Sequence, residues 1–342
     1  MEVACVRVER EQGEETRRRL AERDLVADEL QITVEDGWLY VPVTDAGAVP
    51  DDLTVVEHDI AKRNTQDMPA DLLGFEPTYE RLGDIVILDE DDPDRAQRIA
   101  DAIMESDLPV ETVLNRASKV KGELRVRDWD VLAGNETEAS GASRGSEDAS
   151  SGTETVHREY GCEFLLDVAE VYFSPRLATE RHRVAEQVES EERVFDMFAG
   201  VGPFVVPCAK RGADVVGVDL NERAVEYLRE NARRNGVEDR VTAIQGDVGE
   251  VAPEYEDWAD RVIMNLPHSA DEFVDAAVTI AGDDCVLHYY DIQHEDDPFG
   301  PGEAVIRAAA EPEYEVEVET RHVVRSYAPH ELNVCLDVRL TR

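Results

Sequence analysis

A buried strand that runs directly into a glycine turn is the feature of this sequence that most constrains the fold. Residues 194–204 read VFDMFAGVGPF, which places Gly200 and Gly202 just after an apolar run. A second apolar run, 215–219, ends in Asp219, roughly 20 residues after the turn, as a Rossmann-type nucleotide half-site requires. We therefore expect a parallel α/β sheet with a nucleoside held at the turn.

The turn lacks the third glycine of a dinucleotide fingerprint. Val205 occupies the position where helix and pyrophosphate would approach each other closely. This absence favours a nucleoside without a diphosphate, and S-adenosylmethionine fits: Gly200 and Gly202 would let the methionine moiety lie on the backbone, and Asp219 would hold the ribose hydroxyls. The alternative for this segment alone is an ordinary strand–turn–helix corner with a chance acidic residue.

Strands and helices alternate through residues 166–342, most clearly from about residue 186, which is typical of a doubly wound sheet. Asn221 can cap the helix after Asp219, and Gly236 can end it. Further strands are expected at 240–245, 261–264 and 286–290, and an antiparallel hairpin of 314–324 with 333–339 closes the sheet. The fold class is therefore α/β, with a C-terminal Rossmann-like class I methyltransferase domain.

Two smaller α/β domains are expected before it. Residues 1–65 contain strands at 4–8 and 38–43 and a helix at 14–23. Residues 75–165 contain a strand at 82–88, a helix at 94–105 and a basic strand region at 113–127. Residues 135–155, rich in Ser, Gly, Glu, Ala and Thr, are interpreted as a disordered insertion in a loop between two strands.

The composition indicates the solution conditions in which the protein works more clearly than it indicates a binding partner. The formal net charge is −43, and the chain has four lysines, so its diffuse acidic surface is typical of a protein from molar salt, where the Debye length is about 3 Å. We therefore hypothesise a halophilic archaeal source. The five cysteines and eight histidines form no ligand pattern, which predicts neither disulfides nor metal. No signal peptide or membrane span is evident, so a cytoplasmic location is expected.

Polar residues close four successive predicted strands: Asp196, Asp219, Asp247 and Asn265. Ligands of open α/β sheets bind at this edge, where Asp247 would meet the adenine amino group. Residues 265–268 read NLPH and are related to the Asn-Pro-Pro-aromatic motif of amino-directed nucleic-acid methyltransferases. Asn265 can accept from an N–H of a planar substrate while Pro267 stiffens the turn, and the departure from the motif favours a ring nitrogen as methyl acceptor. Taken singly, each of these residues could be an ordinary turn residue.

Four motifs together resemble one family. They are 171–181 (VYFSPRLATER), the turn at 196–202, the NLP of 265–267, and 325–329 (RSYAP). This combination resembles the archaeal and eukaryotic tRNA (guanine(37)-N1)-methyltransferases. The resemblance covers nearly the whole chain, including the N-terminal module and the basic segment 119–127, and leaves out the insertion at 135–155.

The resemblance implies roles for individual residues. Glu180 would be the general base, Arg125 would contact guanine O6, and Asn265 would orient the base. Arg127, two residues further on and on the same predicted strand face, is the alternative if the alignment with the family's arginine differs by two residues. The remaining implied site residues are Tyr172 and Pro267 around the transfer pocket, and Arg176 and Phe198 along the cofactor.

The chemistry of guanine requires such groups. N1 carries a proton at neutral pH, so a base must remove it before the nitrogen can accept a methyl group, and negative charge then develops on O6. A carboxylate base contributes roughly 10²- to 10⁴-fold, and a cation at O6 acts as an oxyanion donor. Without the family context, Glu180 would be read as a surface glutamate paired with Arg176 or Arg181 on a solvated helix.

A basic island stands out in the acidic chain. Its members are Arg116, Lys119, Lys121, Arg125 and Arg127, and they suit the phosphates of an anticodon stem. The alternative is a cationic strand face that balances neighbouring acids. The resemblance implies tRNA as the partner, contacted at the anticodon loop by this region and at the outer corner by the N-terminal module, with a monomeric protein.

Three other functions stay open at this point. A related enzyme class transfers the aminocarboxypropyl group of the same cofactor in wybutosine biosynthesis, but its members typically lack the N-terminal module and the NLP arrangement. A bifunctional enzyme could also methylate C7 of a tricyclic guanosine derivative. A non-catalytic tRNA-binding protein would retain the cofactor fold as a scaffold, yet Glu180, Arg125 and Asn265 are all present.

Overall fold

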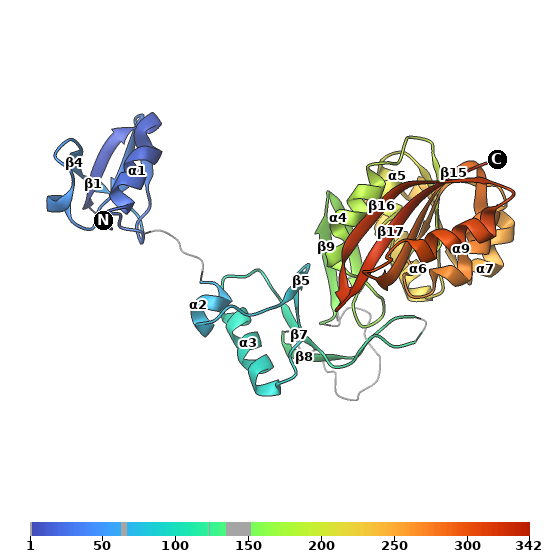
Figure 1. The fold of residues 1–342 in the computed structure, drawn as a ribbon. Coiled ribbons are helices and arrows are strands. Elements are labelled where there is room, and N and C mark those ends of the chain that lie inside the picture. Colours follow the sequence, from blue (N-terminus) through green and yellow to red (C-terminus); the bar gives the residue numbers. More distant parts are fainter. Residues whose placement is uncertain (1, 63–66, 123, 135–151) are drawn as a thin grey trace. The chain divides into compact units, whose positions relative to one another are not determined.

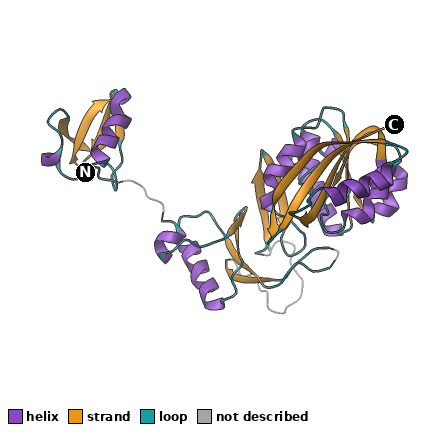
Figure 2. Ribbon diagram, viewed as in Figure 1, coloured by secondary structure: helices purple, strands orange, loops and turns teal. Residues whose placement is uncertain are grey.

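The structure is a computed structural model that describes residues 2–62, 67–122, 124–134 and 152–342. The chain divides into two compact units, Met1–Leu72 and Leu73–Arg342. Figure 1 follows the chain through both, and Figure 2 shows that each combines helices with strands. No described helix is both long and apolar enough to cross a membrane.

The first unit is a four-stranded antiparallel sheet of order β2-β3-β1-β4 with one main helix. Leu20 of the helix packs on Val6, Val8 and Val41 of the sheet, so the amphipathic pattern of the segment is explained by this small core. The elements are β1 (Glu2–Glu9), α1 (Gly13–Ala21), β2 (Thr33–Glu35), β3 (Trp38–Pro42) and β4 (Thr54–Asp59), and α2 (Pro69–Leu73) lies at the boundary of the two units.

The second unit begins with a four-stranded mixed sheet of order β5-β6-β7-β8. The helix α3 (Pro93–Glu105) covers it, capped by Asp92, whose carboxylate accepts from the backbone N–H groups of Asp94 and Arg95. The strands are β5 (Glu80–Leu82), β6 (Ile85–Leu88), β7 (Thr112–Arg116) and β8 (Trp129–Ala133). Trp129 ties this sheet to the rest of the unit, because its indole N–H donates to the carbonyl of Val168 at 2.9 Å.

The larger part of the second unit is built on a seven-stranded sheet of order β13-β12-β11-β14-β15-β17-β16. The first five strands in this order are parallel and β17 is antiparallel to both of its neighbours, which confirms a doubly wound sheet closed by a terminal hairpin. The strands are β11 (Arg193–Asp196), β12 (Asp214–Asp219), β13 (Val241–Gln245), β14 (Ala259–Met264), β15 (Ala281–His294), β16 (Glu315–Ala328) and β17 (Glu331–Thr341).

Helices cover both faces of this sheet. One apolar core lies under α4 (Ala178–Ala185), α5 (Val205–Lys210) and α6 (Glu222–Arg234), and the other lies under α7 (Val248–Val251), α8 (Val274–Ile280) and α9 (Gly300–Ala310). The helix α6 begins and ends as expected, because the side chain of Asn221 accepts from the N–H of Arg223, and Gly236 has φ +67° just after the helix.

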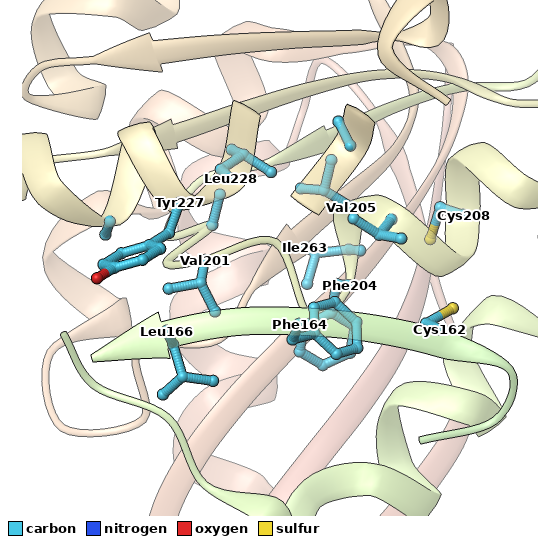
Figure 3. Close-up of a cluster of buried hydrophobic side chains, with 14 of the residues drawn as sticks. Cys162, Phe164, Leu166, Val201, Phe204, Val205, Cys208, Tyr227, Leu228 and Ile263 are labelled. Atoms are coloured by element: carbon cyan, nitrogen blue, oxygen red, sulfur yellow. The ribbon is translucent and has the colours of Figure 1, made fainter. Parts of the chain in front are cut away.

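A hairpin of β9 (Glu154–Glu159) and β10 (Cys162–Asp167) extends the first of these cores. Phe164 and Leu166 of β10 point toward Val201, Phe204 and neighbouring apolar side chains of the glycine turn and α6 (Figure 3). Asn231 fixes the arrangement: its amide N–H groups donate to the carbonyls of Leu165 and Val201, and its oxygen accepts from the N–H of Leu165. The turn is thus bonded to the hairpin as well as packed against it.

Three expectations on local structure need correction. The single strand expected at 82–88 is two strands, β5 and β6, because Gly83 turns the chain at φ +59° where β9 passes close by. The basic strand region expected at 113–127 ends at Arg116, and a loop follows. Most of the expected insertion, 135–155, lies outside the described residues, but Glu154 and Thr155 already belong to β9.

Candidate functional site: a strand-end cleft for a nucleoside

A cleft of about 460 Å³ opens at the carboxyl ends of the parallel strands. This volume is in the range that small-molecule sites occupy, and the position is the one expected for ligands of open α/β sheets. The predicted site residues that line it are Arg125, Tyr172, Phe198, Gly200, Asp219, Asp247 and Asn265. Polar lining residues that were not among the predicted site residues include Ser174, Arg181, His268 and Glu272.

The glycine turn forms the floor beside Asp219. Gly200 and Gly202 have φ +53° and +91°, and a Cβ on Gly202 would lie 2.5 Å from a methyl carbon of Leu228. One carboxylate oxygen of Asp219 accepts from the N–H of Gly200 at 2.7 Å, and the other accepts from the N–H of Asn221 at 2.9 Å. Each oxygen keeps a second lone pair, so the carboxylate fits two neighbouring hydroxyl groups of a ribose.

Asp196 lies under this turn and does not line the cleft. It is 1% exposed, one of its oxygens accepts from the N–H of Phe198 at 3.2 Å, and the other has no hydrogen-bond partner among the described residues. Burial raises the pKa of Asp196 to about 7, and the nearby charge of Asp219 acts in the same direction. A buried acceptor without a donor is suited to a protonated carboxyl group or to a donor brought by a ligand.

The next strand ends supply Asp247 and Asn265. Asp247 follows β13 by two residues and caps α7, accepting from the N–H of Gly249 at 2.8 Å. Asn265 directly follows β14 and lines the cleft, whereas Pro267 does not line it. The carbonyl of Pro267 accepts from the N–H of Ile292 at 3.2 Å. Pro267 therefore bonds the turn to β15 through its backbone and supports the cleft without lining it.

The mouth of the cleft carries Arg125 and Tyr172. Arg125 has φ +55° in a tight loop closed by a hydrogen bond from Lys121 N to Val126 O at 2.8 Å. Its guanidinium carbon lies 5.3 Å from the ring centroid of Tyr172, a cation–π distance. Arg127 lines a neighbouring cleft instead, so the two arginines do not share one strand face as the sequence predicted.

Glu180 lies one layer behind the wall. It is 4% exposed on α4, and the same helix and the turn before it present Arg181 and Leu177 to the cleft. Its carboxylate accepts two hydrogen bonds from Arg183, both at 2.8 Å, and one from the hydroxyl of Tyr290 at 2.7 Å. The alternative, in which Glu180 pairs with Arg176 or Arg181 on a solvated helix, is not what the structure has, because Arg181 pairs with Glu159 at 2.6 Å and Arg176 pairs with Glu80.

Arg183 is held in turn by a buried chain of polar groups. Asp337 accepts from Arg183 and, at 2.6 Å, from His288, whose other ring nitrogen lies 2.6 Å from the guanidinium of Arg261. Since Arg261 can only donate, that nitrogen of His288 accepts, and the ring proton lies on the side of Asp337. Burial lowers the pKa of His288, which agrees with a neutral ring.

The same chain includes a group of potential metal ligands: His288, Cys335 and Asp337 offer three atoms within 4.8 Å of one another. Both nitrogens of His288 are already engaged, by Arg261 and Asp337, and the thiol of Cys335 lies 3.4 Å from Asp337. An arginine in contact with Asp337 adds a positive charge where a cation would bind. The arrangement is thus better explained by hydrogen bonding than by metal binding.

The remaining predicted residues face a second, basic cleft. Arg176 lies there in an ion pair with Glu80, and Arg116 lies between Glu80 and Asp89 at 2.6 and 2.7 Å. Lys119 and Arg127 line the same cleft. Lys121 does not line it, and its ammonium group pairs with Asp128. Arg176, expected beside the cofactor, therefore faces away from the strand-end cleft.

Sequence reasoning missed the polar chain behind Glu180. Its members come from three distant segments: Arg183 from α4, His288 and Tyr290 from β15, and Asp337 from β17, and the register of the two strands pairs His288 with Asp337. One signal was available: both residues interrupt apolar strands at positions where a buried side chain is expected. A polar residue in such a run needs a partner, and these two partner each other.

Comparison with known proteins gives three family matches. The TRM5/TYW2 methyltransferase domain matches residues 155–318, the tRNA methyltransferase 5 N-terminal domain matches residues 5–48, and the TYW2 N-terminal domain matches residues 64–137. A tRNA (guanine(37)-N(1))-methyltransferase Trm5b of Pyrococcus abyssi is 38% identical over 349 residues, covering 98% of this chain and 99% of its own length.

A second relative has a different stated activity. The tRNA(Phe) (4-demethylwyosine(37)-C(7)) aminocarboxypropyltransferase of Pyrococcus horikoshii is 33% identical over 282 residues, covering 81% of this chain and 94% of its own length. The Pyrococcus abyssi methyltransferase thus matches nearly the whole chain, whereas the Pyrococcus horikoshii aminocarboxypropyltransferase leaves about a fifth of it unmatched.

Solved structures agree with these matches. The crystal structure of wild-type Trm5b from Pyrococcus abyssi aligns with a TM-score of 0.72 at 37% identity, covering 99% of this chain and all of that one. The complex structure of aTrm5 and tRNALeu aligns with a TM-score of 0.75 at 31% identity, covering 98% and 99%. A Methanocaldococcus jannaschii TYW2 in complex with AdoMet aligns over 78% of this chain with a TM-score of 0.59 at 28% identity.

Proposed function

The chain belongs to the Trm5-type tRNA methyltransferase family, and from that premise we propose that it transfers a methyl group from S-adenosylmethionine to N1 of guanosine 37 in tRNA. The observation that carries the proposal is the composition of the strand-end cleft. One side offers carboxylates suited to a nucleoside, Asp219 and Asp247, and the other offers a carboxamide and a guanidinium suited to a guanine edge, Asn265 and Arg125.

The cofactor would be held by the strand ends. Asp219 would accept from the ribose hydroxyls, Asp247 would accept from the adenine amino group, and the backbone at Gly200 would lie along the methionine moiety, with Phe198 beside it. Gly202, which does not line the cleft, turns the chain at φ +91°. The unpaired buried oxygen of Asp196 could accept from an ammonium group. When bound, the cofactor supplies an electrophilic methyl group on a sulfonium ion.

The guanine would be held by groups at the mouth. Asn265 can accept from a ring N–H or an exocyclic amine, and Arg125 can donate to O6, where negative charge develops as N1 loses its proton. The cation–π contact with Tyr172 fixes the guanidinium at the mouth, and it costs Arg125 no hydrogen-bond donor. Arg125 is therefore the proposed stabiliser of the developing oxyanion, in preference to Arg127.

Glu180 is the proposed base, and its surroundings set a condition on this role. The carboxylate pairs with Arg183 at 2.8 Å and is 4% exposed, so it is shielded from water. It must give up at least one of the two hydrogen bonds from Arg183 before it can take the proton from N1. Since Asp337 also accepts from Arg183, the guanidinium keeps a carboxylate partner when Glu180 turns toward the cleft.

Single-turnover methyl transfer tests the proposal. Tritiated-methyl cofactor and tRNA transcripts with G or A at position 37 should give labelled 1-methylguanosine from G37 alone. We expect Glu180→Gln and Arg125→Ala each to slow transfer by roughly 10²-fold or more, since base and oxyanion contributions have that size, with cofactor affinity nearly unchanged. Glu186→Gln is the control for the first variant, because Glu186 forms an exposed pair with Arg211 just after the same helix. Arg158→Ala is the control for the second, because Arg158 forms an exposed pair with Glu163 and lines neither cleft.

The outcomes separate the alternatives. Label on A37 transcripts, or none on G37, would reject the reaction, whereas wild-type rates in both variants would reject the residue roles. An aminocarboxypropyl product on a 4-demethylwyosine tRNA would favour the second family branch, whose stated members match 77–81% of the chain. Binding of tRNA with no transfer to any substrate would favour a non-catalytic protein.

A further inference from the structure

The second cleft borders the first and has an unusual charge. Its volume is about 900 Å³, and it shares Gly122, Arg125, Tyr172, Phe173, Ser174 and His268 with the strand-end cleft. Six of its lining side chains are cationic and three are acidic: Arg116, Lys119, Arg125, Arg127, Arg176 and Arg325 against Glu80, Asp89 and Asp91. In a chain with a formal net charge of −43, this local excess of positive charge predicts an anionic ligand.

Several of these cations lack partners within the described chain. No acidic side chain of the described residues lies within ion-pair distance of Arg325, Arg127 or Lys119, and the Nε atoms of Arg325 and Arg116 are buried without a hydrogen-bond acceptor. A buried guanidinium donor without an acceptor is costly, so these groups are suited to acceptor oxygens that arrive with a ligand.

Like charges also face one another. Burial lowers the pKa of Arg176, and the charge of Arg325 lowers it further. Burial likewise lowers the pKa of Arg127, with Arg116 adding to the effect. An anionic oxygen placed between the two members of either arginine pair would relieve their mutual repulsion.

Aromatic rings stand beside these cations. Tyr327 and Tyr172 are 44% and 42% exposed, a high fraction for large rings in a cleft. The hydroxyl of Tyr327 lies 3.1 Å from the Nε2 atom of His268, and the two rings meet edge to face at 5.3 Å, so the Tyr327 side chain is held in one orientation. Exposed aromatic faces beside arginines are the combination that binds single-stranded nucleic acid.

We propose that this second cleft binds the nucleotide next to the methylated one in the RNA chain, an inference that rests on the proposed function. Arg325, together with Arg176, would contact the phosphate that links the two nucleotides, and Tyr327 would stack on the neighbouring base. Adjacency of the two clefts is what the substrate requires, because a flipped target nucleoside stays covalently joined to its neighbour. The inference gives the RSYAP motif at 325–329 a role in holding the substrate.

Equilibrium binding tests the phosphate contact without any methyl transfer. The full-length protein is titrated into a fluorescent anticodon stem-loop RNA with G37, over potassium chloride concentrations in which circular dichroism shows the protein folded. We expect Arg325→Gln to weaken binding about tenfold and to reduce the slope of log K against log salt by roughly 0.7–0.9, the loss of one phosphate contact. Arg321→Gln is the control, since Arg321 lies on the same strand, outside both clefts, and pairs with Glu303.

A second arm tests the stacking contact. Stem-loops with an abasic site at position 36 or 38 remove one neighbouring base at a time, and loss of a stacked base weakens wild-type binding by roughly 5- to 150-fold. We expect one of the two abasic RNAs to show this loss, and Tyr327→Ala to bind that RNA and the intact RNA equally well. Tyr327→Phe should retain the wild-type preference, because the ring face is unchanged.

Each result bears on the inference. The inference would be overturned if Arg325→Gln kept the affinity and salt slope of the wild type, or if the stem-loop did not bind at all. It would also be overturned if wild type and Tyr327→Ala were equally sensitive to both abasic sites. The expected losses in a protein that transfers no methyl group to G37 would support the nucleotide site and reject the proposed reaction. Full methyl transfer to G37 with unchanged binding in both variants would reject the inference alone.

Discussion

Replacing Asp196 by asparagine should change how the stability of the protein depends on pH. The folded protein holds Asp196 protonated up to about pH 7, whereas the unfolded chain releases that proton near pH 3.8. A raised folded-state pKa means that the stability contributed by the protonated carboxyl is fully present below pH 3.8 and is lost as pH rises to about 7. Asp196 therefore destabilises the folded protein at neutral pH.

The magnitude follows from this difference. Each pH unit between the two pKa values costs about 1.4 kcal/mol, so the wild type should lose roughly 3 kcal/mol between about pH 5 and pH 8 through this residue. The side-chain amide introduced by Asp196→Asn does not titrate. Its NH₂ group takes the place of an oxygen without a partner, which costs roughly 1–3 kcal/mol at every pH and does not alter the slope.

Urea unfolding followed by tryptophan fluorescence measures the effect. Trp258 reports on this strand because its ring packs 6.3 Å from that of Phe195, next to Asp196. At constant salt and without cofactor, the difference in unfolding free energy between Asp196→Asn and wild type should rise by about 3 kcal/mol from about pH 5 to pH 8. Parallel curves for the variant and wild type would refute the reasoning.

Asp260→Asn is the matched control in the same sheet. Burial raises the pKa of Asp260, but the hydrogen bonds and the charge of Arg193 together outweigh burial and leave the pKa below its usual value. A lowered folded-state pKa gives stability that is fully present above the unfolded-state pKa of 3.8 and is lost as pH falls below it. Between about pH 5 and pH 8 this variant should therefore run parallel to wild type.

Three further outcomes are expected. Asp219→Asn should weaken cofactor binding roughly 10- to 150-fold in isothermal titration, the loss of charge-assisted hydrogen bonds, with stem-loop affinity unchanged; equal cofactor affinity would remove Asp219 from the site. Gly202→Ala should lower the unfolding free energy by about 1–3 kcal/mol more than Gly236→Ala, because both have positive φ but a Cβ clashes only at position 202; equal losses would show that φ alone matters. Asp337→Asn should lower the melting temperature and slow methyl transfer, whereas the exposed pair member Asp284→Asn should do neither; a stable, fully active Asp337→Asn protein would exclude the buried chain from supporting Glu180.

The sheet and its edge were accessible to sequence reasoning because their signals are local. Apolar runs that end in Asp219 and Asn265 define strands and the ends that face a ligand, and parallel pairing brings those ends to one edge. The helix cap at Asn221 and the helix end at Gly236 likewise each depend on a single residue that the sequence shows. The seven-stranded sheet with its closing hairpin was therefore predicted correctly.

What the sequence could not supply depends on contacts between distant segments. The loop conformation of Arg125, with φ +55°, gives it a different direction from Arg127, and a strand pattern cannot show this. Glu180 is held by Tyr290, 110 residues away, and Arg176 pairs with Glu80, 96 residues away. Such pairings are fixed by tertiary packing, and local propensity carries no information about them.

The wall shared by the two clefts has a thermodynamic consequence. Tyr172, Phe173 and Ser174 line both, so a ligand that shifts this segment alters the free energy of occupancy on its other side. By thermodynamic linkage this effect is reciprocal. If bound RNA changes the dissociation constant of the cofactor by some factor, bound cofactor changes the dissociation constant of RNA by the same factor. A difference in how the cofactor and its demethylated product shift these three residues would therefore appear as a difference in RNA affinity.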